Sequence, residues 1–298
     1  MARHYYTQNW KNRLFDVFLF VFFLFFVFVV LFPFLNQLAI SFNDGDDAIR
    51  KGIYLWPRVF SIDSYRMLFT HNKLLRGALI SVLRVVVGTL TSVFFCGLLG
   101  YLVVQRCFSG RRFMRVLYII TLYFSGGLIP FYLLIVTLGL TNTFTVYWLP
   151  TLLNAYYMLI IASYMQSLPE SLAESARIDG ASELAIFTRI FIPISMPVLA
   201  AISIFSAVGH WNSWFDVLIY NPSGKWDTLQ VYLRRLLLEI EALYKIQDVE
   251  MLRKKMMNVS TETYRAATTM VVTLPIVFVY PFLQRYFISG IVIGAVKG

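Results

Sequence analysis

The sequence predicts an all-α, polytopic membrane protein with six transmembrane helices, and three observations lead to this fold class. The chain of 298 residues is 58% hydrophobic and 17% aromatic, while only 14% of its residues are charged. In soluble domains the charged residues alone approach about a quarter of the chain. The charges here cluster outside long apolar runs, each close to the roughly 20 residues that cross a hydrocarbon core of about 30 Å. Because lipid leaves no water to bind backbone polar groups, these runs are expected to be helices.

The apolar runs set the domain organisation. A membrane domain is predicted over residues 15–287, after a short basic and aromatic segment (residues 1–14) and before a tail (residues 288–298). Glycine and proline in the third run predict a break at residues 125–130, which a membrane tolerates only beside protein or water. Gly97 and Gly100 in the second run predict close approach of another helix. The runs are residues 15–40, 79–104, 116–138, 147–165, 192–219 and 266–287.

The basic residues predict the orientation. Six spans place both termini on one side, and the short loop 105–115 carries four arginines while the opposite short loop, 139–145, carries none. Arginine-rich short loops mark the cytoplasmic side, so both termini are expected to be cytoplasmic. The net charge of +10 suits anionic lipid headgroups at least as well as an acidic cargo. No basic patch is segregated enough to predict nucleic-acid binding.

The long outer loop, residues 221–265, contains a helical pattern. Apolar residues recur with a helical period between positions 229 and 244, with charges on the opposite face. This pattern predicts an amphipathic helix on the outer face, lying on lipid or on a partner. Its basic residues are expected on the solvated or headgroup-facing side.

A polar block interrupts the apolar pattern at residues 167–191. Pro169 and Glu170 suit a first helical turn, since acids complement the positive end of the helix dipole. Asp179 and Gly180 predict a turn, because glycine takes the left-handed conformation that ends a helix. A second short helix is expected near residues 181–190. We call residues 170–190 the helical hairpin; by itself the pattern fits either a docking element or an interfacial linker.

The polar block carries a recognisable pattern at Glu174, Ala176, Asp179, Gly180, Ala181, Ile190 and Pro193. Through these residues it resembles the cytoplasmic EAA motif, Glu-Ala-Ala then Asp-Gly-Ala then Ile-x-Leu-Pro, of permease subunits of ATP-binding-cassette (ABC) importers. Ser175 and Ile192 stand where that motif has alanine and leucine. The resemblance implies the type I importer permease fold, with the hairpin as a coupling helix inserted into a cleft of an ATPase subunit. The implied ATPase-coupling residues are Glu170, Glu174, Ala176, Asp179, Gly180, Ala181, Phe187, Ile190 and Pro193.

The C-terminal residues QRYFISGIVIGAVKG resemble the tail of the smaller, maltose-type permease of carbohydrate-uptake systems. The resemblance extends from the second run to the end of the chain, and implies a bacterial cytoplasmic membrane protein importing oligosaccharides or polysaccharides, a branch that includes alginate importers. It implies that Gly294, Lys297 and Gly298 contact the ATPase. Gly290, Gly294 and Gly298 suit an extended segment that approaches another chain closely, and the alternative is a frayed terminus.

No catalytic chemistry is predicted for this chain. It contains no P-loop sequence and no array of cysteine and histidine at metal-ligand spacing, and Cys96 and Cys107 are expected to be free thiols. We therefore expect this chain to hold no metal or cofactor. ATP and Mg²⁺ are expected on the partner ATPase subunits. The resemblance implies a second homologous permease, an ATPase dimer, an extracytoplasmic solute-binding protein, a saccharide and membrane lipid as partners.

The cargo pathway is predicted from chemistry alone. Sugars present C–H faces to aromatic rings and hydroxyls to amides. Tryptophans can instead form a lipid-facing belt, Arg84 can snorkel, and His210 reads as a packing residue. An acidic sugar would suit Arg84. The candidates are Tyr123, Asn154, Tyr157, Trp211, Asn212, Trp214, Asp216 and Arg84.

Two other classes of protein compete with this prediction. An ion-coupled secondary transporter of a small polar solute would need carboxylates inside the membrane, and Asp216 is the one candidate. It would have no use for the helical hairpin. A membrane-embedded enzyme would need a nucleophile with its base or a metal constellation, and the sequence offers neither.

Overall fold

The computed structural model describes residues 10–50, 52–70, 72–245 and 259–295, and its regular secondary structure in these ranges is helical. Extended backbone pairs there only at an isolated bridge between Asn43 and Phe60. The predicted all-α fold is therefore confirmed for this part of the chain. Two compact units form, one from the described parts of Met1–His71 and Leu237–Thr273, the other from those of Asn72–Leu236 and Leu274–Gly298.

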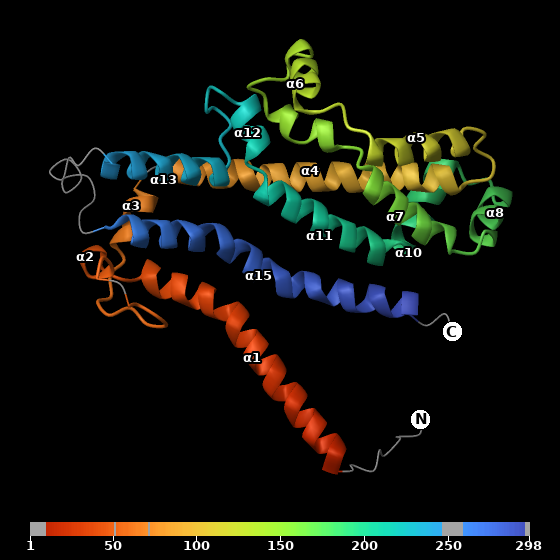
Figure 1. Cartoon of the computed structure of the whole chain (residues 1–298). Helices are drawn as coiled ribbons and strands as arrows, with labels where there is room; N and C mark the ends of the chain where they lie inside the picture. The colour runs from red at the N-terminus through yellow and green to blue at the C-terminus, as the bar shows by residue number, and fades with distance from the viewer. Residues whose placement is uncertain (1–9, 51, 71, 246–258, 296–298) are drawn as a thin grey trace. The chain divides into compact units, whose positions relative to one another are not determined.

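The first unit begins with α1 (Trp10–Ser41), which contains the first predicted run (Figure 1). Its stretch Asn12–Ser41 is long and apolar enough to cross a membrane, and most of its side chains are exposed. A helix of this composition needs apolar surroundings, as a membrane span has. After it, α2 (Gly45–Ala48) is capped by the Asp44 side chain, and α3 (Asp63–Phe69) follows.

The second unit is built around α4 (Asn72–Val104), against which Figure 1 shows α7 (Ala155–Gln166) and α11 (Met196–Asn212). Buried apolar side chains of all three helices form its main core. The predicted close approach is confirmed at Gly100, where an added Cβ would lie 3.2 Å from the backbone nitrogen of Ala162. The glycine thus sets how near α7 comes to α4.

Three of the predicted runs form bent helix pairs. The third run breaks between α5 (Arg111–Tyr123) and α6 (Leu128–Thr137), which meet at 119°. The predicted break at residues 125–130 is therefore confirmed. A bend of 47° separates Phe144–Thr151 from Ala155–Gln166. A bend of 82° separates Glu183–Ile194 from Met196–Asn212. The short elements in these pairs are η1 (Phe144–Tyr147), η2 (Leu149–Thr151), α9 (Glu183–Ile186), η3 (Phe187–Phe191) and α10 (Ile192–Ile194).

The number of membrane spans stays a prediction. Over the described residues, two helices are long and apolar enough to cross a membrane, and five spans result if each bent pair counts as one. The sixth predicted run, residues 266–287, lies inside α15 (Thr261–Ala295), which contains Pro275 and Pro281. Helices thus cover most of each predicted run.

The amphipathic helix of the outer loop is confirmed as α13 (Leu229–Lys245), but its first turns pack on this chain rather than on lipid or a partner. Leu229, Val231 and Leu233 are buried, and the Leu229 backbone nitrogen donates to Ser81 Oγ of α4 at 2.9 Å. Figure 1 shows this end of α13 beside the first turns of α4. Periodicity identifies the apolar face of a helix but not what covers that face. The expected cover, lipid or a partner, is therefore wrong for the first turns of α13.

The C-terminal segment corrects a second expectation. The predicted extended conformation is wrong at Gly290 and Gly294, because α15 continues as helix to Ala295. A glycine inside a helix costs only about 1 kcal/mol relative to alanine, which is too little to end a long helix within an apolar sequence. Lys297 and Gly298 lie outside the described residues.

Candidate functional site

A cavity of about 520 Å³, which we call the polar cavity after the polar residues in its lining, opens in the second unit between α4, α7, α11 and α12 (Phe215–Tyr220). Six of the predicted pathway residues line it, although they are spread along the chain from position 84 to position 216. Tyr123, which is 81% exposed, and Trp211 do not line it. The six are Arg84, Asn154, Tyr157, Asn212, Trp214 and Asp216.

An ion pair between Arg84 and Asp216 occupies one wall of the polar cavity. The two groups face each other along two nitrogen–oxygen pairs, Nη1 with Oδ1 at 3.3 Å and Nη2 with Oδ2 as the closer contact. The guanidinium also lies 4.9 Å from the centre of the Tyr147 ring. The Arg84 side chain is 1% exposed, whereas that of Asp216 is 29% exposed. The snorkelling alternative is therefore wrong, and pairing offsets the cost of burying the charge.

Asn154 and Tyr157 are held in place where α7 begins. The Asn154 side chain caps this helix by accepting from the Tyr157 backbone nitrogen at 3.1 Å. The Asn154 backbone nitrogen donates to the buried thiol of Cys96 at 3.3 Å. Both cysteines are free, as predicted. The cap and the thiol together give this side of the polar cavity a defined shape.

Trp214 lies between α11 and α12, where its indole ring lines the polar cavity. The Arg234 guanidinium carbon of α13 lies 4.0 Å from the ring centre, so one face of the indole is covered by a cation. Phe215 packs edge-on against the same indole. These contacts hold the indole ring in place beside the polar cavity.

Sequence reasoning missed the hydroxyl groups of the polar cavity. Ser206, His210 and Ser213 line it at i, i+4 and i+7 of α11 and its end, a spacing that places them on one helix face. This spacing is the sequence signal that could have identified these three residues as one cavity-lining face. His210 is buried with its ring against Gly88, which confirms its packing role and adds the cavity wall as a second one. Ser92 and Thr151 complete the hydroxyl set.

The helical hairpin forms as predicted. Its first helix is α8 (Ser171–Ile178), and Gly180 follows with φ +80°, the left-handed conformation expected of the turn. Ser182 then caps α9 through a hydrogen bond that its side chain accepts from the Ala185 backbone nitrogen. The predicted second helix, residues 181–190, becomes α9 and the π-helical η3 in sequence.

Polar contacts between α8, α9 and the end of α4 brace the helical hairpin. Arg177 Nε donates to Glu183 Oε1 at 2.6 Å, and its Nη2 donates to Gln105 Oε1 at 2.6 Å. Tyr101 donates its hydroxyl to Glu183 Oε2 at 2.6 Å. The hydrogen bond from Arg177 is the main cause that lowers the pKa of Glu183. The predicted motif residues did not include these four.

The predicted coupling residues divide into a buried base and an exposed tip. Phe187 is 1% exposed and packs on the Tyr101 ring, 5.5 Å between centres, so it anchors the base. At the tip the apolar Ile178 is 86% exposed, and Leu184 is also exposed. Glu174, Asp179, Gly180 and Pro193 are exposed, Ala176, Ala181 and Ile190 are half-buried, and Glu170 forms an ion pair with Arg106 at 3.0 Å.

Replacing Glu183 with glutamine is expected to loosen the helical hairpin at neutral pH. A carboxylate whose pKa is lowered in the folded state stabilises it above the ordinary pKa, and this contribution is lost as pH falls through the folded pKa. Because the Arg177–Glu183 ion pair is partly solvated, we expect it to contribute about 0.5–1 kcal/mol to the stability of the folded hairpin. Hydrogen–deuterium exchange of residues 171–186 should be faster in Glu183→Gln at pH 7, and wild type should approach the variant below about pH 4. The exposed Glu174→Gln is the control, and equal exchange in both variants would contradict the bracing role.

The described residues form helices around a polar cavity, with a braced helical hairpin outside them, and comparisons with known proteins place this arrangement among transport permeases. No family model matches the chain. It is 37% identical over 292 residues to the polygalacturonan/rhamnogalacturonan transport system permease protein YtcP of Bacillus subtilis (strain 168), covering 97% of this chain and 100% of that protein. The chain belongs to the family of sugar ABC transporter permeases. It is a transport subunit and not an enzyme.

Two further comparisons agree with this family. The arabinooligosaccharides transport system permease protein AraQ of Halalkalibacterium halodurans is 31% identical over 285 residues, which are 93% of this chain and 94% of that one. A solved structure of a bacterial ABC transporter involved in the import of the acidic polysaccharide alginate matches with a TM-score of 0.84 and 26% identity, covering 95% of this chain and 99% of that chain. The fold is thus that of an integral membrane permease.

Proposed function

We propose that this chain and a second, homologous permease form the translocation pathway of an ABC importer for an oligosaccharide or polysaccharide. A solute-binding protein delivers the cargo outside, and an ATPase dimer holds ATP and Mg²⁺ inside. In this proposal the chain crosses the bacterial cytoplasmic membrane six times, with both termini in the cytoplasm. Support comes from relatives named for polysaccharide and oligosaccharide transport and from the alginate importer of similar structure.

The polar cavity is the proposed cargo path, and the convergence of six predicted residues on it is the observation that carries this assignment. Tyr157 and Trp214 offer aromatic faces to sugar C–H groups, while Asn154 and Asn212 offer amides to sugar hydroxyls. We propose an acidic cargo unit, because the Arg84 guanidinium matches a carboxylate in shape and charge. Asp216, the more exposed partner, is the group that a cargo carboxylate would replace. Tyr123 and Trp211 are proposed to contact cargo elsewhere along the path.

The helical hairpin is the proposed ATPase-coupling element. A tip bearing exposed Ile178 and Leu184 on a braced base supports docking over a mere linker, since an apolar tip gains free energy when a partner covers it. When the ATPase subunits close on ATP, they would carry the hairpin and switch the pathway by rigid-body motion. We also propose that Gly294, Lys297 and Gly298 contact the ATPase.

A pair of neighbouring tyrosines tests the cargo path. Tyr157 lines the polar cavity, whereas Tyr156 is 57% exposed and does not. In proteoliposomes containing all subunits, Tyr157→Ala should lower saccharide uptake about tenfold, the effect of roughly 1.4 kcal/mol, and Tyr156→Ala should leave it unchanged. A panel of neutral and acidic oligosaccharides, scored by binding-protein-stimulated ATP hydrolysis, identifies the cargo. Uptake driven by an ion gradient without ATP hydrolysis would instead establish the secondary-transporter alternative.

A further inference from the structure

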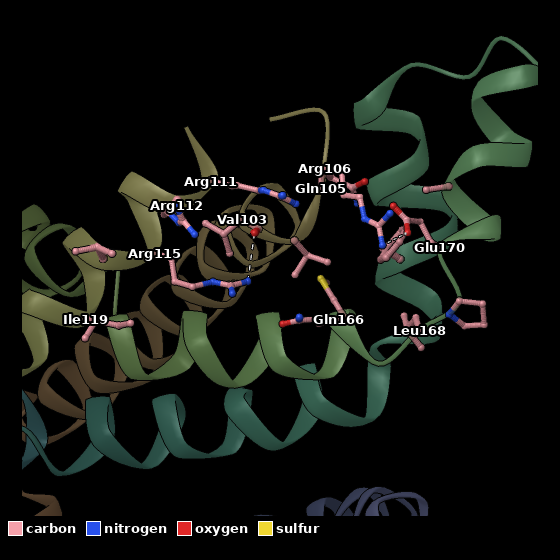
Figure 2. Close-up of a pocket in the computed structure, with 16 residues that line it drawn as sticks. Val103, Gln105, Arg106, Arg111, Arg112, Arg115, Ile119, Gln166, Leu168 and Glu170 are labelled. Carbon is pink, nitrogen blue, oxygen red and sulfur yellow. Dashed lines mark hydrogen bonds and ion pairs between the residues drawn. The ribbon is translucent and has the colours of Figure 1, made fainter. Parts of the chain in front are cut away.

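A second cavity, of about 650 Å³, lies at the base of the helical hairpin (Figure 2). We call it the arginine cavity. Its walls come from the end of α4, the loop after it, the first turns of α5, the end of α7 and the start of α8. Glu170 and Ala173 place the hairpin itself in the wall. The four arginines that line it are Arg106, Arg111, Arg112 and Arg115.

The charges of the arginine cavity are unbalanced. Among the described residues that line it, Glu170 alone carries a carboxylate, and this side chain is paired with Arg106 at 3.0 Å. Arg115 Nη2 donates to the Val103 carbonyl oxygen at 3.4 Å, a neutral acceptor. Among the described residues no carboxylate forms an ion pair with Arg111, Arg112 or Arg115. Three guanidinium groups gathered in one hollow without a counter-charge favour an anionic ligand, and phosphate fits their planar donor pattern.

The apolar part of the arginine cavity narrows the choice of ligand. Val116, which follows Arg115, and Ile119, one turn after Arg115 on α5, line the same hollow, as do Leu168 and Phe191. On the same helix Leu117, Ile120 and Leu122 are also exposed. A ligand that fills this hollow has an anionic head at the first turn of α5 and an apolar body along the helix. A phospholipid has this form, whereas a free phosphate ion would leave the apolar wall uncovered.

We propose that the arginine cavity binds the phosphate headgroup of an anionic phospholipid. The phosphate would bridge Arg111, Arg112 and Arg115 while Arg106 stays paired with Glu170, so that the lipid steadies the base of the helical hairpin. Placing this lipid in the cytoplasmic leaflet rests on the proposed function and its orientation. The binding site itself rests on the cavity, its charge and its apolar wall.

Lipid retention by the purified full chain tests the site without any transport reaction. Native mass spectrometry should show phosphatidylglycerol retained at least tenfold more than phosphatidylcholine. Arg111→Gln combined with Arg112→Gln should remove most of this preference. The matched control is Arg50→Gln with Arg66→Gln, which changes the net charge equally at two exposed positions outside the cavity. Circular dichroism establishes that each variant keeps its helical content.

Each outcome decides the proposal. Loss of the preference in the cavity variant alone supports it, and equal retention of both lipids by wild type overturns it even if a variant fails to fold. Equal retention in the two double variants also overturns it. Inorganic phosphate that competes off phosphatidylglycerol at equimolar concentration would assign the site to free phosphate instead. A result in which lipid binds as expected but no saccharide is transported would refute the proposed function and leave this site standing.

Discussion

Replacing Asp216 with alanine is expected to destabilise the folded chain by about 3–5 kcal/mol, the cost of leaving a buried charge without its partner. Arg84 is 1% exposed and its Nε has no hydrogen-bond partner among the described residues, so the guanidinium has little else to bind. Thermal unfolding of the purified protein, followed by tryptophan fluorescence, measures the effect as a lower midpoint.

The reverse variant and the double variant supply the controls. Arg84→Met should cost less, because Asp216 is 29% exposed and can reach water in the polar cavity. The double variant, Arg84→Met with Asp216→Ala, should be more stable than Asp216→Ala alone, since no unpaired charge remains. Strictly additive effects of the two substitutions would contradict a coupled pair.

Replacing Gly180 with valine is expected to uncouple ATP hydrolysis from transport while the protein stays folded. Gly180 has φ +80°, a conformation in which a β-branched side chain is strained, and the turn would change direction to relieve it. An added Cβ meets nothing within 4 Å, so the strain stays local to the tip. The measurement is saccharide transported per ATP hydrolysed in proteoliposomes, which we expect to fall at least tenfold, about 1.4 kcal/mol in coupling.

Two variants separate backbone conformation from added bulk. Asparagine tolerates the left-handed conformation, so Gly180→Asn should retain most of the coupling. Gly126→Val adds the same side chain at a glycine that is also free of neighbours but lacks a positive φ. Normal coupling in Gly180→Val, or equal loss in Gly126→Val, would refute the role of the bend.

Local patterns were sufficient for much of this fold. Six apolar runs identified helices because lipid forces any such segment to satisfy its own backbone. The break near residues 125–130 and the turn at Gly180 followed from what glycine and proline do to a backbone, wherever the chain goes next. Six of the eight residues predicted for the cargo path line the polar cavity, because few polar side chains interrupt these apolar runs.

Contacts between distant segments were not predictable. The partner of Arg84 lies 132 residues away, and Tyr101 reaches Glu183 across 82 residues. A single sequence contains no record of such pairings, so Arg84 fitted a snorkelling residue as well as a buried one. The start of α13 was misjudged for the same reason, because an apolar face can be covered by lipid, a partner or α4. The arginine cavity was not predictable either, because the residues that line it are spread along the chain from Val103 to Phe191.

The sequence by itself determined that this chain is helical, that it belongs among apolar surroundings, and that a polar hairpin with a left-handed bend interrupts it. These properties depend on side chains within a few turns of one another. Only the tertiary structure decided which polar residues share the polar cavity, which charge neutralises Arg84, and which face of the hairpin is left exposed. Those outcomes depend on packing between helices, where distances of a few ångströms decide whether a charge is paired or costly.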